Sequence, residues 1–156
     1  MKTSIVFFGT PDFAKESLSR LYDDPKVNIK GVVSVPDRQS GRGLKTKQSE
    51  VAAFAVERKI SLSQPSDLES DDFIKVLKGW NAEIFVVVAF RKLPKNVWSI
   101  PKLGTFNIHA SLLPAYRGAA PIQWAIANGE TLTGVTSFFI NDVIDSGDMI
   151  LQLKVK

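Results

Sequence analysis

Cysteine is absent from this 156-residue sequence. Its absence excludes a disulfide scaffold, a thiolate metal site and a cysteine nucleophile. Histidine occurs once, so any mechanism that needs an imidazole must use His109. No apolar run reaches the roughly 18 residues of a membrane-spanning helix. The N-terminus also lacks the longer apolar core and the cleavage site of a signal peptide. We therefore expect a cytoplasmic protein without a membrane partner.

The glycine-rich motifs of common nucleotide sites are missing too. The turn Gly9–Phe13 holds one glycine and a proline, whereas a dinucleotide site needs G-x-G-x-x-G. No P-loop occurs. Asp142, Asp145 and Asp148 are spaced like metal ligands, but the glutamate that completes a calcium-binding EF-hand loop does not follow them. The sequence therefore favours neither a nicotinamide cofactor nor a metal ion.

The charge balance is mildly basic. Lys and Arg number 20 against 16 Asp and Glu, which gives a formal net charge of +4. This excess is compatible with a polyanionic partner without requiring one. The length suits one domain, which can bury a core without disulfides or a structural metal.

Hydrophobic runs alternate with amphipathic segments over the first two thirds of the chain. Strands are predicted at residues 4–8, 29–35, 84–89, 105–109, 135–140 and 149–155. Helices are predicted after Pro11, at 50–59, from a capping box at Ser66–Glu69 to Trp80, and at 121–127. This alternation predicts an α/β protein with an open, mostly parallel Rossmann-like sheet and helices on both faces. Antiparallel pairing is an option for the final strands.

Residues 36–49 form a polar stretch that reads as a long loop. Its four cations, against the single acid Asp37, are Arg38, Arg42, Lys45 and Lys47. From these residues alone two interpretations stay open. One is a solvated charged loop, and the other is a mobile arm that grips phosphates.

Asn107 and His109 are separated by one residue in a predicted strand, so their side chains should project from the same face. At the carboxyl end of a parallel strand, that face borders the crevice where open α/β sheets bind ligands. Asp145 is the acid that pairs most economically with the single histidine. From the residues alone, a buried structural histidine and a turn-capping asparagine remain the alternative.

These three residues suggest acyl transfer without a covalent enzyme intermediate. The Asn107 amide and a protonated His109 would stabilise the oxyanion of a tetrahedral intermediate. Asp145 would orient the imidazole and accept or relay a proton from an attacking amine. The nucleophile motif G-x-S-x-G is absent, so direct transfer between two bound substrates is favoured.

The sequence resembles the folate-dependent formyltransferases. The motifs that carry the resemblance are F-F-G-T-P-D-F (7–13), P-D-R-Q-S-G-R-G (36–43), V-V-V-A-F (86–90), N-I-H-A-S-L-L-P-A-Y-R-G-A-A-P-I-Q (107–123), T-G-V-T (133–136) and D-S-G-D (145–148). The resemblance implies one formyltransferase catalytic domain over residues 1–156. The members that act on tRNA are about twice as long and add a C-terminal β-barrel domain, so we expect a truncated catalytic portion.

The resemblance also implies substrates and residue roles. Its most specific motifs are similar to those of the branch that transfers formyl from 10-formyltetrahydrofolate to methionyl initiator tRNA, with no metal and as a monomer. Asn107, His109 and Asp145 take the catalytic places. The residues that match folate-contacting positions are Phe90, Arg91, Leu93, Ser111, Leu112, Leu113 and Pro114.

The resemblance assigns the 36–49 loop around Arg42 to the tRNA acceptor end. Two alternatives stay open. One is a sugar-nucleotide N-formyltransferase, which shares the same three catalytic residues, and the other is a folate-binding fragment without turnover.

Overall fold

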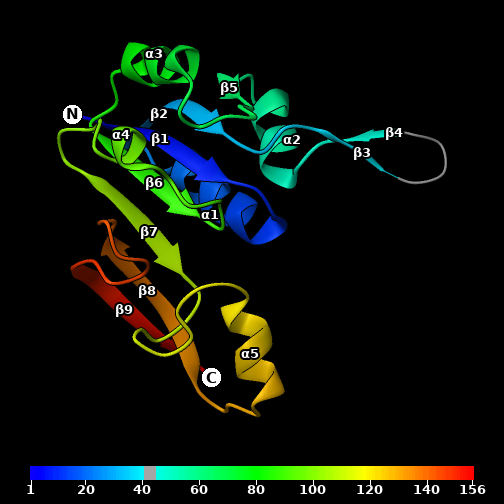
Figure 1. The fold of residues 1–156 in the computed structure, drawn as a ribbon, viewed down its shortest axis with the longest axis vertical. Coiled ribbons are helices and arrows are strands. Elements are labelled where there is room, and N and C mark those ends of the chain that lie inside the picture. Colours follow the sequence, from blue (N-terminus) through cyan, green and yellow to red (C-terminus); the bar gives the residue numbers. More distant parts are fainter. Residues whose placement is uncertain (41–44) are drawn as a thin grey trace.

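A seven-stranded sheet organises the computed structural model, which describes residues 1–40 and 45–156 (Figure 1). In those residues the strand order is β5-β2-β1-β6-β7-β8-β9. The strands are β1 (Thr3–Gly9), β2 (Val27–Val33), β5 (Leu62–Ser63), β6 (Ile84–Val88), β7 (Thr105–His109), β8 (Thr133–Phe139) and β9 (Met149–Val155). The two-residue β5 was not predicted.

Parallel pairing joins the strands from β5 to β7, whereas β8 and β9 are antiparallel to their neighbours. The expected mostly parallel sheet with antiparallel final strands is therefore confirmed. The central strands are the most apolar runs of the sequence because they are covered on both faces. Val6, Phe7 and Phe8 of β1 are completely buried.

Helices cover both faces of the sheet. They are α1 (Asp12–Asp23), α2 (Glu50–Glu57), α3 (Asp71–Trp80), α4 (Lys95–Trp98) and α5 (Pro121–Ala127). Successive residues of β1 alternate between two cores, since Phe7 packs in the cluster with Leu18 of α1, and Phe8 packs in the cluster with Leu77 of α3. The short α4 was not predicted.

The absence of a side chain at Gly9 lets α1 begin directly after β1. A Cβ at this position would lie 2.8 Å from the Ala14 Cβ and 3.0 Å from the Val88 carbonyl oxygen. Pro11 then serves as the N-cap of α1. The first strand-to-helix turn is thus tight because glycine permits the close approach of backbone and helix.

The predicted capping box at Ser66–Glu69 is wrong. Helix α3 is capped by Ser70, whose hydroxyl accepts a hydrogen bond from the Phe73 N–H at 3.4 Å. Asp67 instead closes its own turn by accepting the Glu69 N–H at 2.9 Å. Serine and aspartate serve both turns and caps, so spacing alone did not separate the two.

The prediction that residues 36–49 form a loop is also wrong, because two strands lie in this segment. Strands β3 (Arg38–Ser40) and β4 (Lys45–Lys47) pair antiparallel and project from the body as a hairpin (Figure 1). Polar residues on both strands leave no apolar alternation to reveal them. Arg42, which the prediction placed at the centre of this segment, lies outside the described residues.

None of the helices in the described part of the chain combines the length and the apolar character needed to cross a membrane.

Candidate active site

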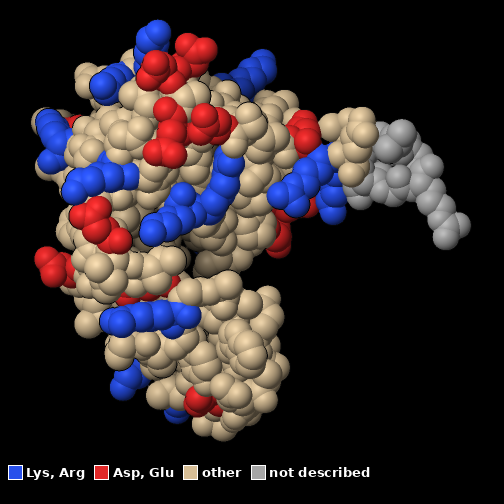
Figure 2. All heavy atoms as spheres, in the orientation of Figure 1, with Lys and Arg blue, Asp and Glu red and all other residues tan. Residues whose placement is uncertain are grey.

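A cavity of about 540 Å³ opens at the carboxyl ends of the parallel strands. Pro11 after β1, Ala89 after β6 and Ala110 after β7 all line it. Figure 2 shows the molecule hollowed beneath the hairpin, between the part that carries β1 and the part that carries α5. This is the edge at which open α/β sheets bind ligands.

Strand β7 places two predicted catalytic side chains in this cavity. Asn107 and His109 both line it, and they are two residues apart on a strand, which puts them on one face. Asn107 pairs in register with Val87 of β6, which also lines the cavity. His109 is only 8% exposed. The structure thus brings the amide and the imidazole together as the spacing predicted.

The two ring nitrogens of His109 face different groups. Nε2 lies 2.7 Å from the carbonyl oxygen of Tyr116. Nδ1 lies 3.9 Å from Oδ2 of Asp145, which is too long for a hydrogen bond. A carbonyl oxygen can only accept, so Nε2 is the donor in the first contact.

Asp145 reaches the cavity from the loop between β8 and β9. Its Oδ2 accepts a hydrogen bond from the Gly118 N–H at 2.7 Å, and its side chain is 11% exposed. A Cβ on Gly147 would collide with the carbonyl oxygen of Phe139, so glycine allows this loop to pack against the end of β8. The D-S-G-D motif therefore places a carboxylate beside the only histidine.

Unusual backbone conformations gather around this cavity. Six non-glycine residues of the described part have positive φ. Ala89, Ala120 and Asp145 line the cavity and Tyr116 contacts His109, whereas Lys59 and Asn81 lie elsewhere. Non-glycine residues in this region cost about 1–3 kcal/mol each and persist where the surrounding structure holds them. Such residues concentrate at functional sites, which agrees with the cavity as the candidate active site.

The predicted folate-contacting residues divide into two groups. Phe90, Arg91 and Leu93 line the cavity. The Arg91 guanidinium lies 5.4 Å from the Phe90 ring and donates to the carbonyl of Ser66 at 3.0 Å. The segment after β6 therefore forms one wall of the cavity.

The second group, Ser111–Pro114, is not among the residues that line the cavity. The Ser111 hydroxyl donates to the Ala115 carbonyl at 2.7 Å, and the Leu113 N–H donates to the Thr136 hydroxyl at 3.1 Å. These bonds fix the segment that follows His109. Contact of this group with folate stays a prediction.

Two predicted phosphate-binding cations lie on the described part of the hairpin with exposed side chains. Arg38 and Lys47 face each other in the register of β3 and β4. Lys45 belongs to β4 as well. The hairpin therefore carries cations on two paired strands away from the sheet, as Figure 2 shows in blue at its base.

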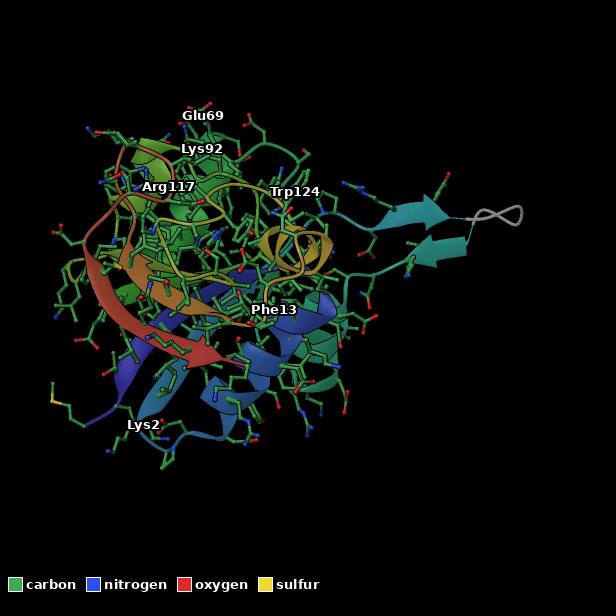
Figure 3. The ribbon with its side chains drawn as sticks, turned by 90° about the horizontal axis from the view of Figure 1, so that it is seen from below. Lys2, Phe13, Glu69, Lys92, Arg117 and Trp124 are labelled. Carbon is green, nitrogen blue, oxygen red and sulfur yellow. The ribbon has the colours of Figure 1, made fainter. Side chains whose placement is uncertain are left out.

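The residue-by-residue predictions missed an apolar rim. Its partly exposed side chains line the cavity and are Phe13, Ile122, Val143 and Ile144. Phe13 on α1 and Lys92 after β6, both labelled in Figure 3, belong to different elements, and both line the cavity. Exposed apolar residues inside the G-T-P-D-F and R-G-A-A-P-I-Q motifs were the available signal for Phe13 and Ile122.

Comparison with known proteins identifies the family. A profile described as "Formyl transferase" matches residues 1–156. The chain belongs to the formyl transferase family.

Two curated relatives within this family are identical to this chain at about half of the aligned positions. Methionyl-tRNA formyltransferase of Flavobacterium psychrophilum is 53% identical over 97% of this chain and 48% of its own length. Methionyl-tRNA formyltransferase of Bacteroides fragilis is 50% identical over 97% of this chain and 46% of its own length. The chain thus spans about half the length of the curated relatives it matches.

Solved structures share the fold. Phosphoribosylglycinamide formyltransferase from Bacillus halodurans has a TM-score of 0.78 at 18% identity, over 98% of this chain and 79% of that one. Phosphoribosylglycinamide formyltransferase from Coxiella burnetii has a TM-score of 0.74 at 24% identity, over 99% of this chain and 73% of that one. At these identities the likeness establishes the fold.

Proposed function

We propose that this chain is the catalytic domain of a methionyl-tRNA formyltransferase. It transfers the formyl group of 10-formyltetrahydrofolate to the amino group of methionyl initiator tRNA. The observation that carries the proposal is the meeting of Asn107, His109 and Asp145 in one cavity at the carboxyl edge of the sheet. Relatives that bear this name at 50% and 53% identity support the choice of acceptor.

The three side chains suit direct attack of an amine on a formyl carbon. As the new C–N bond forms, charge develops on the formyl oxygen. The Asn107 amide and a protonated His109 donate hydrogen bonds to that oxygen, the ring through Nδ1–H because Nε2–H is engaged by the Tyr116 carbonyl. Asp145 accepts the proton that the attacking amine loses. Collapse of the tetrahedral intermediate breaks the bond to the carrier nitrogen, and Asp145 returns the proton it accepted to that leaving nitrogen. No covalent enzyme intermediate is needed.

The cavity has room for both reacting groups. At about 540 Å³ it falls within the usual size of small-molecule sites. We assign the wall of Phe90, Arg91 and Leu93 to the folate ring, because these three residues line the cavity directly after β6. The two substrates then react by proximity, which supplies a large share of the acceleration.

The hairpin supplies the contacts with the acceptor. Arg38 and Lys47 carry positive charge on a projecting arm above the hollow, where the phosphates of a tRNA acceptor end would enter. Arginine and lysine contacts to phosphates position a nucleic acid without reading its sequence. We also propose that the protein acts as a monomer in the cytoplasm.

The test is transfer of a labelled formyl group from 10-formyltetrahydrofolate to a panel of acceptors. The panel holds methionyl initiator tRNA, an amino-sugar nucleotide and glycinamide ribonucleotide. Label on methionyl-tRNA supports the proposal. Label on the sugar nucleotide points instead to the related sugar enzymes. Binding of a folate analogue without transfer to any acceptor points to a folate-binding domain without turnover.

A further inference from the structure

A short turn contacts both members of the His109–Asp145 pair. The turn consists of residues 116–118 and is called here the 116–118 turn. At one end, the carbonyl oxygen of Tyr116 lies 2.7 Å from Nε2 of His109. At the other end, the N–H of Gly118 donates to Oδ2 of Asp145 at 2.7 Å. The positions of the imidazole and the carboxylate therefore both depend on this turn.

The backbone of the 116–118 turn needs an external support. Tyr116 has φ of +54° and Gly118 has φ of +85°. The left-handed region is unfavourable for a residue with a bulky side chain such as tyrosine, so tertiary contacts must hold it there.

The tyrosine side chain supplies such a contact. Its hydroxyl donates to Oε1 of Glu130 at 2.7 Å and accepts from Nδ2 of Asn128 at 3.0 Å. Both partners follow α5, which ends at Ala127. The ring of Tyr116 thus braces the turn against the segment between α5 and β8. A hydrogen bond to a carboxylate is of the stronger, charge-assisted kind.

The brace has a defined consequence for the imidazole. The Tyr116 carbonyl can only accept a hydrogen bond, so it selects the ring form that carries a proton on Nε2. Nδ1 then faces Asp145 at 3.9 Å. The hydrogen bonds of the ring set which nitrogen carries the proton, and the group within hydrogen-bond distance here is the backbone carbonyl at Nε2.

We propose that Tyr116 and Glu130 are positioning residues for His109. Their hydrogen bond holds the Tyr116 carbonyl against Nε2 and thereby fixes the tautomer and the orientation of the ring. The catalytic consequence rests on the proposed function, whereas the effect on the ring does not. Neither side chain needs to touch a substrate.

Nuclear magnetic resonance tests the effect on the ring directly. The chain contains one histidine, so a long-range proton–nitrogen spectrum of the imidazole needs no assignment. At a pH where the ring is neutral, the wild-type spectrum should show the Nε2–H tautomer. Tyr116→Phe and Glu130→Ala should both shift the ring toward a mixture of the two tautomers. An unchanged tautomer in both variants overturns the proposal.

Two variants serve as matched controls. Tyr22→Phe removes the same hydroxyl from the only other tyrosine, on α1. Glu130→Gln keeps an oxygen that accepts the hydrogen bond of Tyr116 and should retain the wild-type tautomer. A shift in Tyr22→Phe as large as that in Tyr116→Phe contradicts the proposal. Because Glu130 is exposed, its substitution tests the brace even if Tyr116→Phe fails to fold.

The kinetic readout separates positioning from binding. In formyl transfer, Tyr116→Phe and Glu130→Ala should lower kcat about two- to tenfold, the range for loss of one hydrogen bond. KM for the formyl donor should stay unchanged. The double variant should be no slower than either single variant, and additive losses would contradict one shared brace. If the wild type transfers no formyl group, the proposed function fails while the ring spectrum still decides this inference.

Discussion

The imidazole of His109 and the carboxylate of Asp145 face each other across 3.9 Å, measured from Nδ1 to Oδ2. That separation exceeds a hydrogen bond, and the same Oδ2 is engaged at 2.7 Å by the Gly118 N–H. Contacts between catalytic groups are often long without substrate and tighten when it binds. The pair is therefore preassembled by the fold, with its carboxylate already anchored to the backbone.

Asp145→Asn should abolish most of the transfer while leaving the site assembled. The amide oxygen of asparagine can still accept the Gly118 N–H, so the loop keeps its place. The negative charge and the proton acceptor are lost, and we expect kcat to fall about 10²- to 10⁴-fold. The measurement is single-turnover formyl transfer, with affinity for a folate analogue as control. Wild-type turnover in this variant would contradict the role of Asp145.

The hairpin prediction concerns salt dependence. Replacing Arg38 and Lys47 by alanine should weaken tRNA binding and lower the slope of log affinity against log salt by about 1.4–1.8, for two lost phosphate contacts. Lys75→Ala with Lys78→Ala on α3 removes two exposed cations away from the hairpin and should leave the slope unchanged. Equal slopes for the two double variants would remove the hairpin from the acceptor site.

Gly9→Ala tests the tight turn between β1 and α1. The added Cβ meets the Ala14 Cβ at 2.8 Å and the Val88 carbonyl oxygen at 3.0 Å, so overpacking should lower the free energy of unfolding by about 1–3 kcal/mol. Gly79→Ala is the matched control, because a Cβ there meets nothing within 4 Å on helix α3. It should raise stability by about 0.5–1 kcal/mol. Urea denaturation measures both, and a neutral Gly9→Ala contradicts the packing argument.

The sequence revealed the parts of the fold that bury apolar side chains. The run Ile84–Ala89 predicts a central strand because a strand covered on both faces must be apolar throughout. The hairpin was not predicted because the side chains of Arg38, Gln39, Thr46 and Lys47 are exposed and the two strands are held by backbone pairing. The cap of α3 escaped because Ser66 and Ser70 are chemically identical candidates.

The sequence predicted those parts of the candidate site that depend on the type and spacing of side chains. Asn107 and His109 follow from the two-residue period of a strand, and Asp145 was the economical partner for a single histidine. The Tyr116 carbonyl and the Gly118 N–H could not be predicted, because every residue has these groups and only the fold decides where they point. In the apolar rim, Phe13 and Ile122 lie on α1 and α5, whereas Val143 and Ile144 lie in the loop after β8. No single periodicity of the sequence joins these positions.

Glu83 makes stability depend on acid pH. The Ser4 backbone N–H at 3.0 Å is the main cause that lowers the pKa of Glu83, followed by Lys102 at 3.3 Å and the Ser4 hydroxyl. Because the folded pKa lies below the unfolded one, the stabilisation is complete above the unfolded pKa. It is lost as the pH falls through the folded pKa. Glu83→Gln should therefore flatten the acid limb of the stability curve.

Ser4→Ala provides the comparison for Glu83. It removes the hydroxyl contact and keeps the backbone N–H that is the main cause of the lowered pKa of Glu83. Most of the acid dependence should then remain. The measurement is the free energy of unfolding by urea between about pH 3 and pH 6, the range of ordinary carboxyl pKa values. An acid limb as steep in Glu83→Gln as in the wild type would contradict this assignment.

The most direct test of the central claim is formyl transfer by His109→Ala. Labelled 10-formyltetrahydrofolate and methionyl initiator tRNA are mixed with the wild type and the variant, and folding of the variant is checked by circular dichroism. We predict label on the methionyl group with the wild type, and a rate about 10²- to 10⁴-fold lower with a folded His109→Ala. Transfer at the wild-type rate by the folded variant would contradict the assignment of this cavity as the active site.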